Sequence, residues 1–195
     1  KNLQFGNEVY KSIIGVRPNI ALVNEQAFSS GLIEIYLEEK YEAIIMEWNN
    51  PYRMHQEWKS EWRYFPQIAV DNYGNKIKLI WNQSIAFQKF QRYAHREIEL
   101  DEYFEYLQSC LSESERNLSL YGSDGEVFDF RPTRYKSEAP LGIKSEWKRL
   151  EKLIEMIQDN KLFKWISPSA VLKSNNKLAF NNLYLESAAQ PIPVK

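Results

Sequence analysis

Short apolar runs alternate with helical repeats along most of this chain. Five runs have the length and composition of buried strands, and they lie at residues 20–23, 41–48, 77–81, 117–121 and 163–166. Apolar side chains at helical spacing follow in four places, beginning near Ser30, Ser84, Asp101 and Ser145. Strands that alternate with helices are typical of a largely parallel sheet. The pattern therefore predicts an α/β fold.

This alternation favours an α/β barrel over a sandwich or a helical bundle. Five strands are too few to close a barrel, because closure ties the number of strands to their tilt and stagger. We therefore expect a partial barrel with parallel strands, whose N-terminal strands are missing from this chain. The 195 residues, of which 44% are hydrophobic, suffice for one core. We expect residues 1–195 to form a single domain, excerpted from a longer protein.

The charge balance argues against two classes of partner. With 25 basic and 26 acidic residues the net charge is -1, so the chain lacks the positive excess that binds nucleic acid or anionic lipid. No apolar run reaches the roughly 20 residues that span a bilayer. A lone cysteine, Cys110, cannot form an internal disulfide and favours a reducing compartment. We therefore expect a cytoplasmic protein that binds neither nucleic acid nor a membrane.

Two carboxylates follow predicted strands and are the candidate catalytic groups. Glu25 comes after the run at 20–23, and Asp124 comes after the run at 117–121. Barrel enzymes place their chemistry on the loops that follow the carboxyl ends of the strands. Two acids that converge there can break a glycosidic bond, one as nucleophile and the other as proton donor. Local sequence alone also fits a turn residue for Asp124 and an exposed helix-entry residue for Glu25.

The residues around both acids resemble one known family. The sequence LVNEQAF at 22–28, with the helix and strand that follow it, is similar to the nucleophile segment of glycoside hydrolase family 57. The sequence YGSDGE at 121–126 is similar to the Asp-Gly-Glu motif of that family. The resemblance implies that Glu25 is the nucleophile and that Asp124 is the general acid/base. It also implies that Glu126 contacts substrate or holds the loop.

The resemblance further implies a fold and an activity. Family 57 enzymes have an incomplete seven-stranded (β/α) barrel, so this chain is expected to be the C-terminal portion of such a barrel. The implied activity is hydrolysis or transglycosylation of α-glucans with retention of configuration, on an oligo- or polysaccharide and without a cofactor. Aromatic side chains near the predicted strand ends are candidate sugar platforms, and they are Trp48, Trp81 and Phe130.

Two other interpretations stay open at this point. A metal-dependent polysaccharide deacetylase has a similar partial barrel but needs clustered His and Asp ligands. The two histidines, His55 and His95, have no ligand-like spacing, so no metal site is expected. A non-catalytic carbohydrate-binding protein could keep the fold without the chemistry. Leu22 and Asn24 stand where the family usually has Trp and Pro or Thr, which leaves this last alternative open. The oligomeric state is also open.

Overall fold

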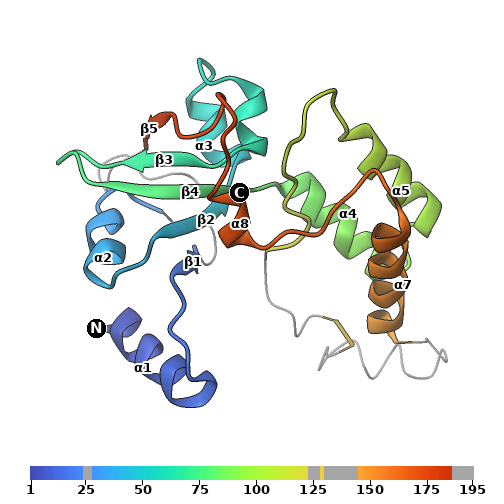
Figure 1. The fold of residues 1–195 in the computed structure, drawn as a ribbon, viewed down its shortest axis with the longest axis horizontal. Coiled ribbons are helices and arrows are strands. Elements are labelled where there is room, and N and C mark those ends of the chain that lie inside the picture. Colours follow the sequence, from blue (N-terminus) through green and yellow to red (C-terminus); the bar gives the residue numbers. More distant parts are fainter. Residues whose placement is uncertain (24–27, 123–127, 130–144, 186–195) are drawn as a thin grey trace. The chain divides into compact units, whose positions relative to one another are not determined.

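A computed structural model describes most of the chain, namely residues 1–23, 28–122, 128–129 and 145–185 (Figure 1). The chain divides into two compact units. The sheet unit comprises residues 1–84 and 167–195, and the helical unit comprises residues 85–166. Each unit has a hydrophobic core of its own. None of the described helices is long and apolar enough to cross a bilayer.

The sheet unit is built on five strands in the order β1-β2-β4-β3-β5 (Figure 1). The strands are β1 (Ile20–Leu22), β2 (Ala43–Glu47), β3 (Gln67–Val70), β4 (Lys76–Asn82) and β5 (Asn182–Tyr184). β1, β2 and β4 pair in parallel, as do β3 and β5, whereas β3 and β4 are antiparallel. The sheet is thus mostly parallel, as predicted. The expected strands at 20–23, 41–48 and 77–81 are confirmed as β1, β2 and β4.

The two inner parallel strands are buried on both faces. Ala43, Ile44 and Leu79 have no exposed surface, and such near-continuous apolar runs are typical of parallel strands that are covered on each side. The helices of this unit are α1 (Asn2–Ile14), α2 (Leu32–Glu38), α3 (Asn49–Met54), the 3-10 helix η2 (Ser60–Tyr64) and α8 (Pro168–Val171). Burial of β2 and β4 therefore fixes the centre of the sheet unit.

A tight turn joins β3 to β4. The Asp71 carboxylate accepts hydrogen bonds from the backbone N–H groups of Tyr73 and Asn75, both at 2.8 Å. Gly74 has a φ of 86°, in the left-handed region that glycine adopts without strain. The turn reverses the chain, so β3 pairs antiparallel with β4. The strand runs predicted from the sequence do not include β3.

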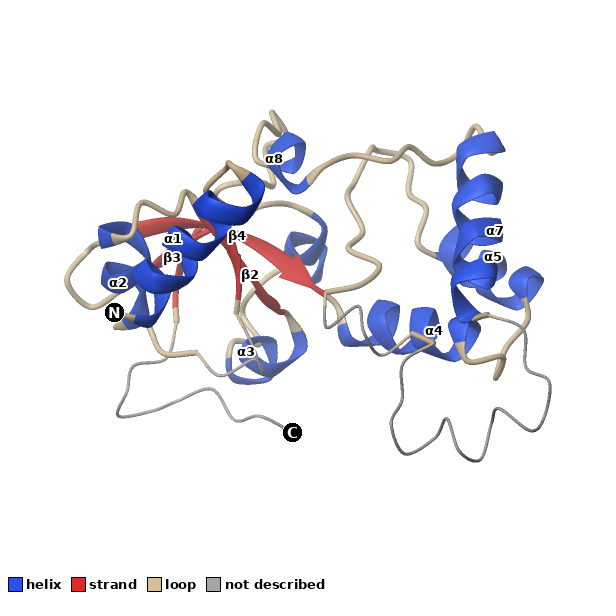
Figure 2. Ribbon diagram, turned by 90° about the horizontal axis from the view of Figure 1, so that it is seen from below, coloured by secondary structure: helices blue, strands red, loops and turns tan. Residues whose placement is uncertain are grey.

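Two predicted strands are absent from the described structure. Residues 117–121 and 163–166 are irregular, so both expectations were wrong. Leu118 and Leu120 are partly buried against the core of the helical unit, and their alternation reflects a loop packed on helices. A strand needs a hydrogen-bonded partner, and the described part of the helical unit contains no strand (Figure 2).

The described part of the helical unit is built on three helices that the sequence predicts. They are α4 (Ser84–Ala94), which begins at the last residue of the sheet unit, α5 (Leu100–Ser109) and α7 (Glu146–Asp159). The buried residues of its core are Tyr93, Ile98, Tyr103, Leu107, Leu153 and Ile157. Burial raises the pKa of the Tyr103 phenol, which therefore stays neutral.

One buried amide connects β3 to the chain that leads into β5. Gln67 has no exposed surface, and its Nε2 donates to the carbonyl oxygen of Leu178 at 2.9 Å. Its Oε1 accepts from the backbone N–H of Asn181 at 2.9 Å and from the side-chain amide of Asn181 at 3.0 Å. The Gln67 side chain thus both donates to and accepts from a segment that is distant in the sequence.

Replacing Gln67 tests this connection. Gln67→Leu should lower the free energy of unfolding by about 2 kcal/mol, because the backbone N–H of Asn181 would lose its acceptor and the carbonyl of Leu178 would keep only its bond from the Asn181 side-chain amide. Urea denaturation followed by circular dichroism measures the effect. The same substitution at the exposed Gln108 of α5 should change stability by less than about 0.5 kcal/mol. Equal losses in the two variants would contradict the role of Gln67.

Candidate functional site

The predicted catalytic acids lie outside the described residues. Glu25 falls within 24–27, Asp124 and Glu126 fall within 123–127, and Phe130 falls within 130–144. The structure does describe the residues on either side of each acid, and these show how each segment begins and ends.

The segment that carries Glu25 begins and ends in the core of the sheet unit. Val23 and Phe28 are 1% and 3% exposed and belong to the same apolar cluster. The backbone N–H of Val23 donates to the carbonyl of Ile45 at 2.9 Å, which extends the parallel ladder between β1 and β2. Glu25 therefore follows directly from the carboxyl end of β1, two residues beyond a buried anchor.

The segment that carries Asp124 has aromatic anchors at both ends. The rings of Tyr121 and Phe128 lie 5.1 Å apart, and Phe90 of α4 lies 5.1 Å from Tyr121 and 5.8 Å from Phe128. Phe87, also on α4, stacks on Tyr121 at 5.3 Å. Aromatic pairs at these distances are attractive beyond the area that they bury. Both ends of 123–127 are thus held beside one helix.

A carboxylate network fastens the chain just after this segment. The Asp129 carboxylate accepts from the backbone N–H of Glu146 at 2.6 Å, and the Glu146 carboxylate accepts from the backbone N–H of Asp129 at 2.9 Å. His95 Nδ1 lies 2.8 Å from the other oxygen of Glu146. Ser145 occupies the N-cap position of α7, but its side chain makes no capping bond and donates to Asp129 instead. Asp129 therefore caps α7.

The two described candidate platforms lie in the core of the sheet unit. Trp48 and Trp81 are 1% and 2% exposed, and their rings meet edge to face at 5.0 Å. Tyr52 stacks on Trp48 at 4.7 Å, and Trp58 lies 5.8 Å from Trp48. In this arrangement both tryptophans pack the carboxyl-end side of β2 and β4. A sugar ring could stack on either one only after the residues that cover it had moved.

Sequence reasoning missed a buried acid at this same edge. Glu47, the last residue of β2, is 6% exposed and accepts from the backbone N–H groups of Asn49 and Asn50, both at 2.7 Å. The hydroxyl of Ser84 also donates to Glu47. Its register partner on β4 is Asn82, which is also buried. The available signal was a glutamate that closes an apolar strand immediately before a helix start.

The histidines have other surroundings. His55 Nδ1 lies 3.1 Å from Glu57 Oε1, and its ring stacks on Trp58 at 4.3 Å. His95 faces Glu146, as described above. Among the residues that the structure describes, no three His, Cys, Asp or Glu side chains are grouped as metal ligands would be.

The fold is a mixed α/β fold on a mostly parallel sheet. The sequence model of Glycosyl hydrolase family 57 matches residues 1–186, and the chain belongs to that family. Both Glu25 and Asp124 lie within the matched residues.

Two solved structures share the fold. A 4-alpha-glucanotransferase from Thermococcus litoralis superposes with a TM-score of 0.68 at 18% identity, over 95% of this chain and 27% of that one. The alpha-amylase AmyC from Thermotoga maritima superposes with a TM-score of 0.50 at 12% identity, over 93% of this chain and 46% of that one. At these identities the likeness concerns the fold, and this chain spans less than half of either protein. No curated protein matches the sequence.

The buried acid of β2 gives a direct test of how this edge is held. Glu47→Ala should lower the free energy of unfolding by about 3 kcal/mol, because the N–H groups of Asn49 and Asn50 and the Ser84 hydroxyl lose a charged acceptor. Thermal and urea unfolding measure this loss. Glu42→Ala, just before the same strand, removes an exposed ion pair with Lys78 and should cost less than about 1 kcal/mol. A smaller loss for Glu47 than for Glu42 would contradict the assignment.

Proposed function

We propose that this chain forms part of a retaining glycoside hydrolase or transglycosylase that acts on α-glucans. The observation that carries the proposal is the family match over residues 1–186, which includes both acid-bearing segments. The solved structures of similar fold are a 4-alpha-glucanotransferase and an alpha-amylase, and both names point to α-linked glucose polymers as the substrate class. The partner is accordingly an oligo- or polysaccharide.

In the proposed mechanism Glu25 is the nucleophile and Asp124 is the general acid/base. The Glu25 carboxylate attacks the anomeric carbon while Asp124 transfers its proton to the departing glycosidic oxygen, and this forms a covalent glycosyl-enzyme. Asp124, now a carboxylate, takes a proton from water or from a sugar hydroxyl as that oxygen attacks the same carbon. The second displacement releases Glu25 and restores the original configuration.

The anchored ends of both segments support these roles. A nucleophile has to be held at a fixed distance from the reacting carbon, since small misplacements cost large factors in rate. Val23 and Phe28 fix the ends of one segment in an apolar core, and Tyr121 and Phe128 fix the ends of the other against α4. Glu25 also follows the carboxyl end of a parallel strand, where barrel enzymes carry their chemistry.

Glu126 has a supporting role in this proposal. It lies two positions after Asp124, in the same acid-bearing segment. We assign it to contact with substrate hydroxyls or to holding the loop, and not to proton transfer. Hydrolysis and transfer share the glycosyl-enzyme and differ in whether water or an acceptor sugar reaches it, so the proposal covers both.

Conservative substitutions of the two acids test the assignment in the complete protein. Glu25→Gln should reduce turnover of maltooligosaccharides by a factor of about 1,000 or more, and Asp124→Asn by at least about 100. Product analysis by chromatography measures the rates. Glu34→Gln on α2 and Asp101→Asn on α5 remove exposed charges and serve as matched controls with unchanged turnover. Unchanged turnover in both acid variants would rule out the proposed glycosidase function. Lost turnover with retained sugar binding would support the catalytic roles of the two acids.

The configuration of the first-formed product tests the retaining mechanism separately. Proton NMR during cleavage of a maltooligosaccharide should show the α-anomer appearing first, with the β-anomer rising later by mutarotation. Retention requires the two carboxyl groups to lie about 5 to 5.5 Å apart, whereas inversion needs a gap of about 6.5 to 9.5 Å for a water. A β-anomer as the first product would show that the enzyme is inverting and would rule out the role of Glu25 as nucleophile.

A further inference from the structure

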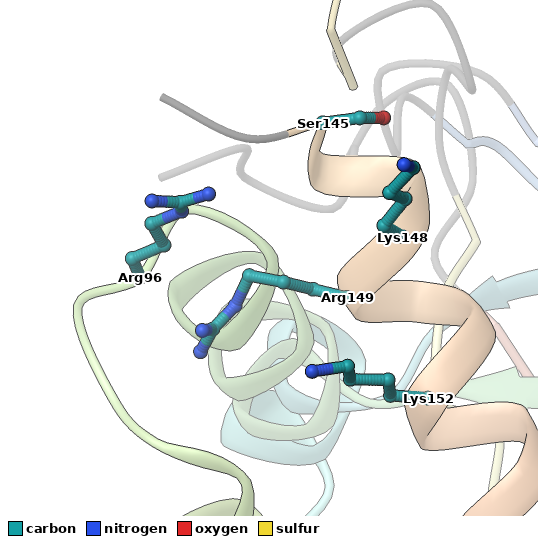
Figure 3. Close-up of a pocket in the computed structure, with 5 residues that line it drawn as sticks. All are labelled: Arg96, Ser145, Lys148, Arg149 and Lys152. Carbon is teal, nitrogen blue, oxygen red and sulfur yellow. The ribbon is translucent and has the colours of Figure 1, made fainter. Parts of the chain in front are cut away.

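A cavity of about 460 Å³ in the helical unit has a strongly basic lining (Figure 3). The residues that line it come from α7 and from the loop that follows α4, and they are Arg96, Ser145, Lys148, Arg149 and Lys152. Four of these five carry a positive charge. A cavity of this size lies in the range that holds small organic ligands.

Arg149 is fixed in position at this cavity. Its Nε donates to the carbonyl of Tyr93 at 2.8 Å and its Nη2 to the carbonyl of Ile98 at 2.9 Å. The guanidinium also lies 4.5 Å from the centre of the Tyr93 ring. A guanidinium has more N–H donors than these contacts use. In Figure 3 it extends from α7 toward the part of the helical unit that carries Arg96, which also lines the cavity.

Lys148 and Lys152 add charge that the described residues do not neutralise. Both are exposed, they stand four positions apart on α7, and neither forms an ion pair with a described residue. Like charges at this spacing destabilise a helix. Glu99 is the acid that reaches Arg149, at 3.5 Å from Nη1, and its side chain is 77% exposed. The described residues that line the cavity therefore carry more positive than negative charge.

The start of α7 does not supply this anion preference. Asp129 already accepts the N–H of Glu146 at 2.6 Å, so a side chain of the protein occupies the end of the helix. Asp129 caps that end, and the Glu146 carboxylate accepts in return from the backbone N–H of Asp129. Any preference for an anion at this cavity therefore comes from the lysine and arginine side chains.

We propose that this cavity binds a small phosphate-bearing anion through Lys148, Arg149 and Lys152. A phosphate group carries up to two negative charges and several acceptor oxygens, which suit an arginine fork together with lysine ammonium groups. The proposed glucan substrate is uncharged and needs no such set of cations, so this site is for a second ligand. Inorganic phosphate and a phosphorylated sugar share this chemistry.

Calorimetric titration of the full chain with inorganic phosphate and with a hexose monophosphate tests the site. Chloride buffers of matched ionic strength remove general salt effects. Saturable binding is expected, and it should weaken as salt screens the charges. Lys148→Ala with Lys152→Ala should weaken the affinity by at least about tenfold, because hydrogen bonds to charged groups are lost. Tighter binding of the hexose phosphate than of phosphate would identify the ligand as a phosphorylated sugar. Equal binding of the two would identify the ligand as phosphate itself.

A charge-matched variant provides the control. Lys161→Ala with Lys164→Ala removes two exposed lysines of the same unit that do not line the cavity, and it should leave the affinity unchanged. No binding to the unmodified chain, or equal weakening in the two double variants, would overturn the proposal. Circular dichroism confirms that each variant is folded. Because the readout is binding and not turnover, failure here would leave the proposed glycosidase function standing.

Discussion

Parallel pairing of β1, β2 and β4 is the constraint on which the candidate site depends. It brings the carboxyl ends of three strands to one edge of the sheet, and the segment that carries Glu25 starts at that edge. At the same edge Glu47 accepts hydrogen bonds from the start of α3 and from Ser84, and it thereby connects these segments to the end of β2. A buried carboxylate is stable only when donors surround it, so this contact and the strand pairing depend on each other.

Elements with a strong local pattern could be predicted from the sequence, and elements defined by distant contacts could not. β2 is a long apolar run and α7 has a regular apolar face, so both were correctly expected. β3 depends on the Asp71 turn and on the long-range contacts of Gln67 with Asn181, which no local pattern reveals. The runs at 117–121 and 163–166 have apolar side chains but pair with no strand in the described part of the chain, and apolar periodicity alone cannot supply a partner.

The candidate site shows the same division. Glu25 and Asp124 were predicted from motifs, and both lie within the residues that the family model matches; their catalytic roles stay a prediction. Trp48 and Trp81 were chosen because aromatic rings near strand ends can stack on sugars, but an aromatic ring at a strand end can equally complete the core, and here both are buried. Glu47 was missed because a glutamate in a strand is usually read as exposed. Burial and partners become visible only in the folded chain.

The central claim is that Glu25 forms a covalent bond to the sugar. Trapping the complete protein with a fluorinated glycosyl fluoride, which forms the glycosyl-enzyme quickly and releases it slowly, tests this most directly. Peptide mapping by mass spectrometry should find one sugar attached to the peptide that contains Glu25, and no adduct in the Glu25→Gln variant. A sugar attached to another carboxylate, or full turnover with no trapped adduct, would contradict the account.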